Sequence, residues 1–191
     1  MRSIRIAFIV CLVSASSAVA QKSTEKYDDI FRKYSKRYFG PGFDWKYFKA
    51  QAMAESNLNP DAESFVGARG LMQLMPSTFQ IIQTKRPEFT SINDPEWNIA
   101  AWIMHDRHLW KQWQKKVVPD SQLPLFMTAS YNAGEGTITR ATVMAKDKQL
   151  DHAHWNSIEM IAPTVPRWRY RETLSYVRKI EKNYETLKAK R

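Results

Sequence analysis

Apolar residues recur every three or four positions along most of this chain, and that spacing constrains what it can fold into. The repeat places apolar side chains along one face of an α-helix, whereas a half-buried strand requires strict alternation. We find no convincing alternating segment, no internal repeat and no low-complexity tract. The sequence therefore predicts a single, mainly helical domain of the all-α class.

Start and stop signals place the individual helices. One apolar stripe runs from Tyr27 to Tyr38, after a cap at Ser23 or Thr24. The pair Asp94-Pro95 combines a capping side chain with proline at the first helical position, which predicts a helix to about Lys115. Other helices are expected to start at Asp44 and Pro76 or to span 124–131 and 137–146, and the last helix is expected to carry the apolar residues between Leu174 and Leu187. The stretch 156–170 is expected to be irregular.

Residues 1–20 have the pattern of a secretory signal peptide. Arg2 and Arg5 precede a short apolar run, Ile6 to Val13, and Ala18-Val19-Ala20 offers a cleavage site. The apolar run is too short to span a bilayer comfortably, and an uncleaved anchor is the alternative. Because no small residue precedes Cys11, we expect no lipid anchor there.

Cleavage after residue 20 would leave 171 of the 191 residues and remove the only cysteine. The loss of Arg2 and Arg5 would lower the formal net charge from +10 to +8. The exported chain would then depend on core packing without a disulfide. A basic exported protein suits a polyanionic partner, and export makes nucleic acid the least expected one. The basic tail, 188–191, is expected to be solvated or to touch anionic wall polymer or a membrane surface.

Glu55 occupies an unusual position for a charged residue. In the helix expected from Asp44, Trp45, Phe48 and Ala52 form the apolar face, and Glu55 falls on the same face. Burial raises the pKa of a carboxyl group, and a proton retained near neutral pH is what a general acid needs. The alternative is a salt-bridged glutamate at the end of the helix.

A glycine-rich turn, residues 64–76, follows this helix. Gly67 and Gly70 permit backbone conformations and close approaches that a Cβ would block. The Gln73 amide lies among apolar residues, so if buried it needs partners, which a bound sugar could supply. Alternatively, the turn leaves Gln73 exposed.

Two later segments combine polar and aromatic side chains. Tyr131 and Asn132 fall at the end of an expected helix, where Asn-Ala-Gly could also be a simple C-terminal cap. Glu172 and Tyr176 lie one helical turn apart and can face the same groove. Glu172 could instead complement the dipole of the last helix from its first turn.

Together these segments resemble the soluble lytic transglycosylase (SLT) family, whose catalytic domain has a goose-type-lysozyme-like fold with a glycan cleft. The matching motifs are Glu55-Ser56 with Asn59-Pro60, 67–73 with Met75-Pro76, 130–134, and Glu172-Thr173 with Tyr176. Four motifs in order are far more specific than any one. The resemblance covers roughly Phe43 to Tyr184. It implies an N-terminal helix within 21–42, a catalytic domain over 43–187 and the basic tail.

The chain also departs from the family pattern. Ala101-Trp102 and Met104-His105 stand where the family usually has a small residue and a Tyr-Leu pair. The stretch 168–170 makes the approach to the fourth motif bulkier than usual. These changes leave the acid intact and concern the shape of the subsites and the preferred glycan.

The resemblance implies a reaction and a set of site residues. Family enzymes cleave the β-1,4 bond between N-acetylmuramic acid and N-acetylglucosamine without adding water, and leave a 1,6-anhydromuramoyl end. By resemblance Glu55 acts as acid and then as base. The residues implied to bind glycan are Ser64, Gln73, Met75, Tyr131 and Asn132 along the cleft and Glu172 and Tyr176 at its floor. The partner would be peptidoglycan in a bacterial periplasm or envelope, with no cofactor or metal.

Other functions remain open at this point. We find no obvious second carboxylate, and Asp61 and Glu63 are expected to be solvated loop charges. If one of them activated water, the protein would be a hydrolytic goose-type muramidase. A glycan-binding module with a dead site is a further alternative, against which the intact Glu55 argues.

A metal site and a sugar platform are weaker possibilities. The pairs His105 with His108 and His152 with His154 lack the H-E-x-x-H pattern, so we expect no metal. The tryptophans of the long middle helix are expected to pack rather than to form a sugar platform; they are Trp97, Trp102, Trp110 and Trp113.

Overall fold

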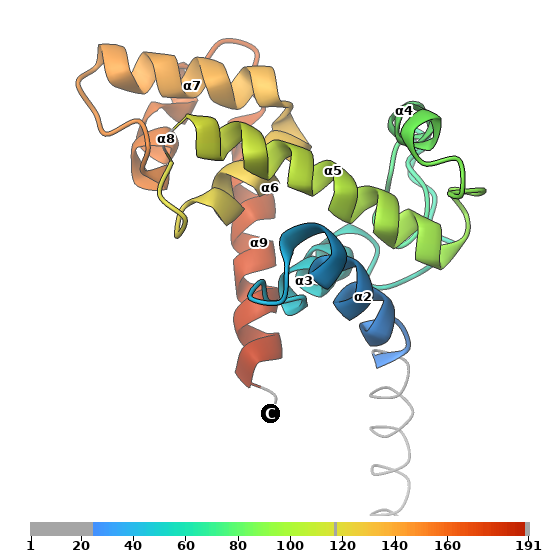
Figure 1. The fold of residues 1–191 in the computed structure, drawn as a ribbon. Coiled ribbons are helices and arrows are strands. Elements are labelled where there is room, and N and C mark those ends of the chain that lie inside the picture. Colours follow the sequence, from blue (N-terminus) through green and yellow to red (C-terminus); the bar gives the residue numbers. More distant parts are fainter. Residues whose placement is uncertain (1–24, 117, 190–191) are drawn as a thin grey trace, which may run out of the picture.

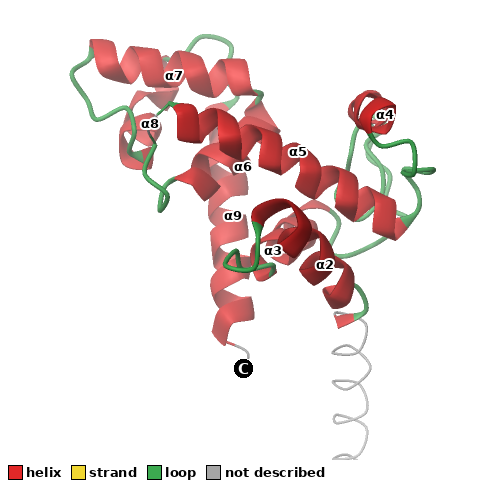
Figure 2. Ribbon diagram, viewed as in Figure 1, coloured by secondary structure: helices red, strands yellow, loops and turns green. Residues whose placement is uncertain are grey.

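The computed structural model describes residues 25–116 and 118–189. Within these ranges the chain forms eight α-helices and one short 3₁₀ helix, and no strand beyond isolated bridges in the glycine-rich turn (Figures 1 and 2). The elements are α2 (Asp28–Phe39), α3 (Lys46–Glu55), α4 (Pro76–Lys85), α5 (Pro95–Lys115), α6 (Leu123–Ala133), α7 (Glu135–Asp147), α8 (Trp155–Ile161), η1 (Ala162–Thr164) and α9 (Tyr170–Ala189). The predicted all-α class is confirmed.

Two long helices connect the parts of the domain. Helix α5 packs against α2 and α6, and α9 packs against α3 and α6. In Figure 1, α7 and α8 lie toward one end of α5, and α2 and α4 lie toward the other. Each end has its own apolar core, and both long helices contribute to both cores: Leu109 and Ile180 to one, Trp113 and Val177 to the other. The acid-bearing helix α3 belongs to the first core.

Helix α5 begins as its sequence predicts. Asp94 Oδ1 accepts hydrogen bonds from the backbone N–H groups of Glu96, at 2.8 Å, and Trp97, at 3.2 Å. Pro95 occupies the first helical position, where its missing N–H costs nothing. Trp102 and Trp113 are fully buried, and Trp97 and Trp110 pack partly buried against the cores.

The expectation of an irregular segment over 156–170 is wrong for its first part. Residues Trp155–Ile161 form helix α8, and η1 follows directly. Trp155, Ile158 and Ile161 are spaced by three and are all buried in the second core. The apolar spacing therefore prevails over the nearby prolines, the first of which lies in η1.

The predicted signal peptide over 1–20 and the cap at Ser23 or Thr24 lie outside the described residues, as do the last two residues of the tail. In the part of the chain that is described, no helix has both the length and the apolar character needed to cross a membrane.

Candidate active site

Glu55 is the last residue of α3 and lies half-buried against α9. Its Oε1 accepts a short hydrogen bond from the hydroxyl of Tyr176, one of the residues singled out from sequence. Burial raises the pKa of Glu55 to about 7, although the Tyr176 bond and the positive charge of Lys179 both oppose the rise. The carboxyl group can thus hold a proton near neutral pH and still be stabilised when it ionises.

The salt-bridge alternative does not describe this glutamate. Lys179 Nζ donates instead to the backbone carbonyl of Ala54, at 2.6 Å. Across the described ranges no lysine, arginine or histidine forms an ion pair with Glu55. Lys179 therefore closes the end of α3 and acts on the carboxyl group only through space.

A backbone turn fixes the chain directly after Glu55. Asn57 and Leu58 both have positive φ, at 55° and 63°, which ends the helix sharply. Ser56 Oγ donates to the Leu71 carbonyl at 2.7 Å and so joins this turn to the glycine-rich segment. The first two sequence motifs are therefore in direct contact.

The glycine-rich segment is held against α5 by a buried asparagine that the sequence reading missed. Asn98 Nδ2 donates to the carbonyls of Arg69 and Ile92, and its Oδ1 accepts from Met72 N–H, each at 2.9 Å. Gly70 has φ +76°, and a Cβ there would lie 2.6 Å from Asn98 Nδ2. The sequence signal for a buried Asn98 was its position directly after the apolar Trp97 in a predicted helix.

Gln73 satisfies its amide within the same segment. It has a positive φ of 47°, and its Nε2 donates to the carbonyls of Ala62 and Gly70, both at 3.0 Å. The protein, rather than a sugar, thus supplies partners for the N–H groups. The Gln73 carbonyl accepts from Tyr131 Oη at 3.4 Å, so the structure brings the second and third motifs together.

Tyr131 lies over one of the residues that depart from the family pattern. Its ring centroid is 3.6 Å from that of Trp102, and the His105 ring stands edge-on to it at 5.8 Å. Burial and the nearby Glu55 raise the pKa of Tyr131 well above its ordinary value, so its hydroxyl is neutral. Burial lowers the pKa of His105 to about 4, so this imidazole is also neutral at pH 7.

The four remaining candidates lie in more open positions. Ser64 Oγ accepts from Ala68 N–H at 2.9 Å, within its own turn. Met75 is 37% exposed at the start of α4, and Asn132 is exposed near the end of α6. Glu172 is half-exposed in the first turn of α9 and pairs with Arg169 at 2.9 Å. The structure thus gathers Glu55, Gln73, Tyr131 and Tyr176 and leaves these four outside that cluster of contacts.

This geometry agrees with the comparison to known families. Residues 29–154, well over half of the chain, match the family model described as the transglycosylase SLT domain. This chain belongs to the transglycosylase SLT domain family.

The SLT chain is similar to two proteins named membrane-bound lytic murein transglycosylase F. The one from Shewanella pealeana is 29% identical over 173 residues, which cover 85% of this chain and 34% of that protein. The one from Desulfosudis oleivorans is 30% identical over 161 residues, which cover 78% of this chain and 34% of that protein. The chain therefore spans about a third of the length of the curated relatives it matches.

Solved structures show the same fold. The 70 kDa soluble lytic transglycosylase from Escherichia coli matches with a TM-score of 0.61 and 26% identity, over 84% of this chain and 24% of that one. An inactive mutant of lytic transglycosylase Slt from Pseudomonas aeruginosa matches with a TM-score of 0.65 and 24% identity, over 87% of this chain and 25% of that one. The predicted SLT-type lysozyme-like fold is confirmed.

A second buried carboxylate in the SLT domain also escaped the sequence reading. Asp106, on α5, is fully buried, and its Oδ2 accepts from Gln51 Nε2 at 2.8 Å and Trp102 Nε1 at 3.1 Å. Burial raises the pKa of Asp106 to about 7, and the charge of Glu55 adds to the rise. By contrast, Asp61 and Glu63, the carboxylates considered from sequence, are exposed, as expected for loop charges.

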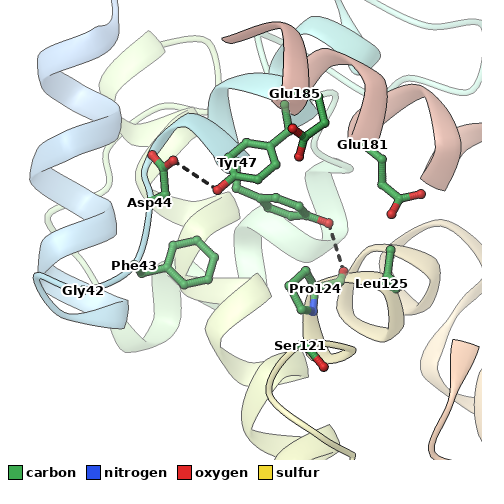
Figure 3. A pocket seen from close by; sticks show the side chains of 10 residues that line it. Gly42, Phe43, Asp44, Tyr47, Ser121, Pro124, Leu125, Glu181 and Glu185 are labelled. Atoms are coloured by element: carbon green, nitrogen blue, oxygen red, sulfur yellow. Dashed lines mark hydrogen bonds between the residues drawn. The ribbon is translucent and has the colours of Figure 1, made fainter. Parts of the chain in front are cut away.

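The SLT domain has a separate hollow of about 420 Å³ at the other end of α3 (Figure 3). Tyr47, from α3, donates to the Pro124 carbonyl at 3.1 Å, and Tyr184, from α9, donates to Asp44 at 3.1 Å. Glu181 and Glu185 face the same hollow. Because Glu55 is at the opposite end of the helix, this hollow does not contain the candidate acid.

Proposed function

We propose that this protein is a peptidoglycan lytic transglycosylase that cleaves the β-1,4 bond between N-acetylmuramic acid and N-acetylglucosamine and leaves a 1,6-anhydromuramoyl end. The observation that carries the proposal is Glu55, a half-buried carboxyl group with a pKa of about 7 and a hydrogen bond from Tyr176, within an SLT domain. The names of the similar proteins, lytic murein transglycosylases, support the same reaction class.

In the first step Glu55 acts as a general acid. Tyr176 occupies Oε1, so Oε2 is the oxygen left to carry the proton toward the glycan. That proton passes to the glycosidic oxygen as the bond to C1 of the muramoyl residue breaks. The muramoyl 2-acetamido group then stabilises the positive centre at C1.

In the second step the same carboxylate acts as a base. It takes the proton of the C6 hydroxyl while the C6 oxygen bonds to C1, which closes the 1,6-anhydro ring and restores the acid. The Tyr176 hydroxyl and the Lys179 charge stabilise the carboxylate between the two steps, since both lower its pKa. A general acid–base contributes about 10²–10⁴-fold, so orientation must supply much of the remainder.

The surroundings of Glu55 favour this single-carboxylate reaction over activation of water by a second one. Asp106 is fully buried behind Gln51 and Trp102, so it cannot touch a glycan bound at the surface. Asp61 and Glu63 are exposed, and Glu63 pairs with Arg69 at 3.4 Å.

The proposed glycan-binding residues extend from Glu55 along the motifs. They are Ser64, Gln73, Met75, Tyr131, Asn132, Glu172 and Tyr176. Tyr131 and Tyr176 would present neutral rings and hydroxyls beside the acid, and both are buried enough for their pKa values to be raised well above the ordinary value. We also propose that residues 43–187 form the catalytic unit, on which the helix within 21–42 packs, and that the protein acts in the bacterial cell envelope.

The products of purified peptidoglycan decide the reaction. Mass spectrometry should find muropeptides with anhydromuramoyl ends, each lighter by one water than the corresponding reducing-end product. Reducing ends would instead identify a hydrolytic muramidase. Binding to peptidoglycan with no soluble product would identify a binding module, and either result would refute the proposal.

A further inference from the structure

Two buried side-chain oxygens between α3 and α5 lack hydrogen-bond donors. Asp106 Oδ1 and Gln51 Oε1 have no hydrogen-bond partner anywhere in 25–116 or 118–189, although both residues are fully buried. The other atoms of the same two groups are bonded, because Gln51 Nε2 donates to Asp106 Oδ2 at 2.8 Å. Two buried acceptors without donors are costly, since each loses its bonds to water.

A proton on Asp106 would give both oxygens a hydrogen-bond partner. If Asp106 carries a proton on Oδ1, that O–H can donate to Gln51 Oε1 while Gln51 Nε2 donates to Asp106 Oδ2. The acid and the amide then form a paired ring of two hydrogen bonds, and both unpaired oxygens gain a partner. An ionised Asp106 would have only acceptors to offer.

No cation among the described residues is paired with Asp106 to compensate a negative charge. No lysine, arginine or histidine of the described chain forms an ion pair with it, and its only hydrogen-bond donors are Gln51 and Trp102. The titratable groups that act on or respond to its charge are Glu55 and Tyr47 of α3, Tyr131 of α6 and Tyr176 of α9, none of which is a cation.

The position of Asp106 connects it to both sides of the proposed site. Gln51 lies one helical turn before Glu55 on α3, so the two side chains share a face. Trp102 Nε1 donates to Asp106 at 3.1 Å, and the Trp102 ring contacts Tyr131. Asp106 thus links the helix that carries Glu55 to the Tyr131 ring, whose pKa responds to the charge of Glu55.

We propose that Asp106 is a positioning residue that works as a neutral acid, paired with the Gln51 amide, and that it fixes Glu55 and Tyr131 relative to each other without placing a second negative charge beside Glu55. The positioning role rests on the proposed function, whereas the protonated pair does not. Asp106 itself does not touch the glycan.

The effect of the Glu55 charge on the pKa of Asp106 agrees with a neutral Asp106. Burial is the largest cause of the raised pKa of Asp106, and the charge of Glu55 adds to the rise. Ionisation of Glu55 therefore favours the protonated form of Asp106.

Carbon-13 NMR of the aspartate carboxyl groups tests the protonated pair directly in the full chain. The Asp106 signal is identified by its loss in Asp106→Asn, and Asp120→Asn, an exposed acid, is the control. We expect Asp106 to remain protonated at pH 5.5 and to titrate far above its ordinary value of 3.8. In Glu55→Gln the midpoint should move down, because the neighbouring charge is gone. An ordinary midpoint near 4 overturns the proposal.

Kinetics test the positioning role. Asparagine offers one acceptor and one donor side, as the neutral acid does, so Asp106→Asn should keep kcat/KM within about threefold and leave the pH midpoint of the Glu55 limb unchanged. Asp106→Leu leaves the Gln51 amide and Trp102 N–H unpaired, so kcat should fall about tenfold or more with little change in KM. A limb that moves to lower pH in Asp106→Asn would show a charged Asp106 and refute the proposal.

The two proposals fail in different ways. Full turnover by Glu55→Gln would refute the role of Glu55 but leave the Asp106 titration intact. A normal Asp106 titration with anhydromuramoyl products would refute only the neutral pair. If Asp106→Leu does not fold, the NMR titration and the Asp106→Asn profile still decide.

Discussion

Glu55 and Asp106 are both carboxyl groups whose pKa burial raises to about 7, yet their surroundings differ in kind. Glu55 ends a helix, is half-buried and is bordered by a loop held in place by hydrogen bonds. Asp106 lies inside a long helix, fully buried between an amide and an indole. The comparison teaches that a raised pKa marks a buried acid, whereas access to the surface is what distinguishes a general acid from a structural one.

The largest expected effect comes from removing the proton that Glu55 donates. Glu55→Gln should lower kcat/KM on peptidoglycan by about 10²–10⁴-fold, because the amide cannot donate the proton. Binding to insoluble peptidoglycan, measured by co-sedimentation, should persist. Glu88→Gln, at an exposed loop position, is the matched control. Full activity in Glu55→Gln would end the assignment of the acid.

Asp106, the fully buried acid, should instead make the free energy of unfolding depend on pH. Its folded-state pKa, about 7, lies above the ordinary 3.8, so the folded chain binds the extra proton between those values. Its stabilising contribution is full below about pH 4 and is lost as the pH rises through 7.

The free energy of unfolding should therefore fall in the wild type relative to Asp106→Asn, by on the order of 3 kcal/mol between pH 4 and pH 8. Urea denaturation of both proteins across that range measures the difference, in which the titration of His105 cancels. Parallel curves would contradict a raised pKa for Asp106.

The loop that borders Glu55 should depend on the close contact between Gly70 and Asn98. Gly70→Ala adds a Cβ 2.6 Å from Asn98 Nδ2 and should destabilise the fold by about 2 kcal/mol beyond Gly67→Ala. Gly67 has a similar positive φ, +83°, with open space around it, so it isolates the backbone cost. Thermal unfolding of the two variants gives the comparison, and equal losses would show that the contact does not matter.

The smallest expected effect concerns the hydroxyl that touches Glu55. Tyr176→Phe removes a bond that lowers the pKa of Glu55, so the alkaline limb of kcat/KM should move to higher pH. The carboxylate also loses a donor, so the rate at the optimum should fall about tenfold. Tyr184→Phe, two turns later on α9, is the control. If the alkaline limb of kcat/KM does not move, Tyr176 does not influence the pKa of Glu55.

Much of this molecule could be predicted from local patterns. The apolar spacing predicted the helices, the Asp94-Pro95 signal predicted the start of α5, and the position of Glu55 on an apolar face predicted its burial. Each of these depends on residues within a few turns of one another. Helix α8 was not predicted, because two prolines follow it closely and its apolar signal consists of only three spaced residues.

The unpredicted parts depend on contacts between distant segments. Asn98 and Asp106 are buried polar residues on α5. Their structural roles depend on hydrogen bonds to Met72, 26 positions away, and to Gln51, 55 positions away. Gln51 shows the same limit, because its partner lies on another helix.

The bond between Tyr176 and Glu55 joins residues 121 positions apart. Closing so large a loop costs chain entropy before the contact is gained. A chain in which α9 has not docked therefore lacks the Tyr176 hydrogen bond to Glu55 and the burial that α9 gives to this carboxyl group. If the proposed function is correct, Glu55 becomes a reactive acid only after α9 has docked on α3.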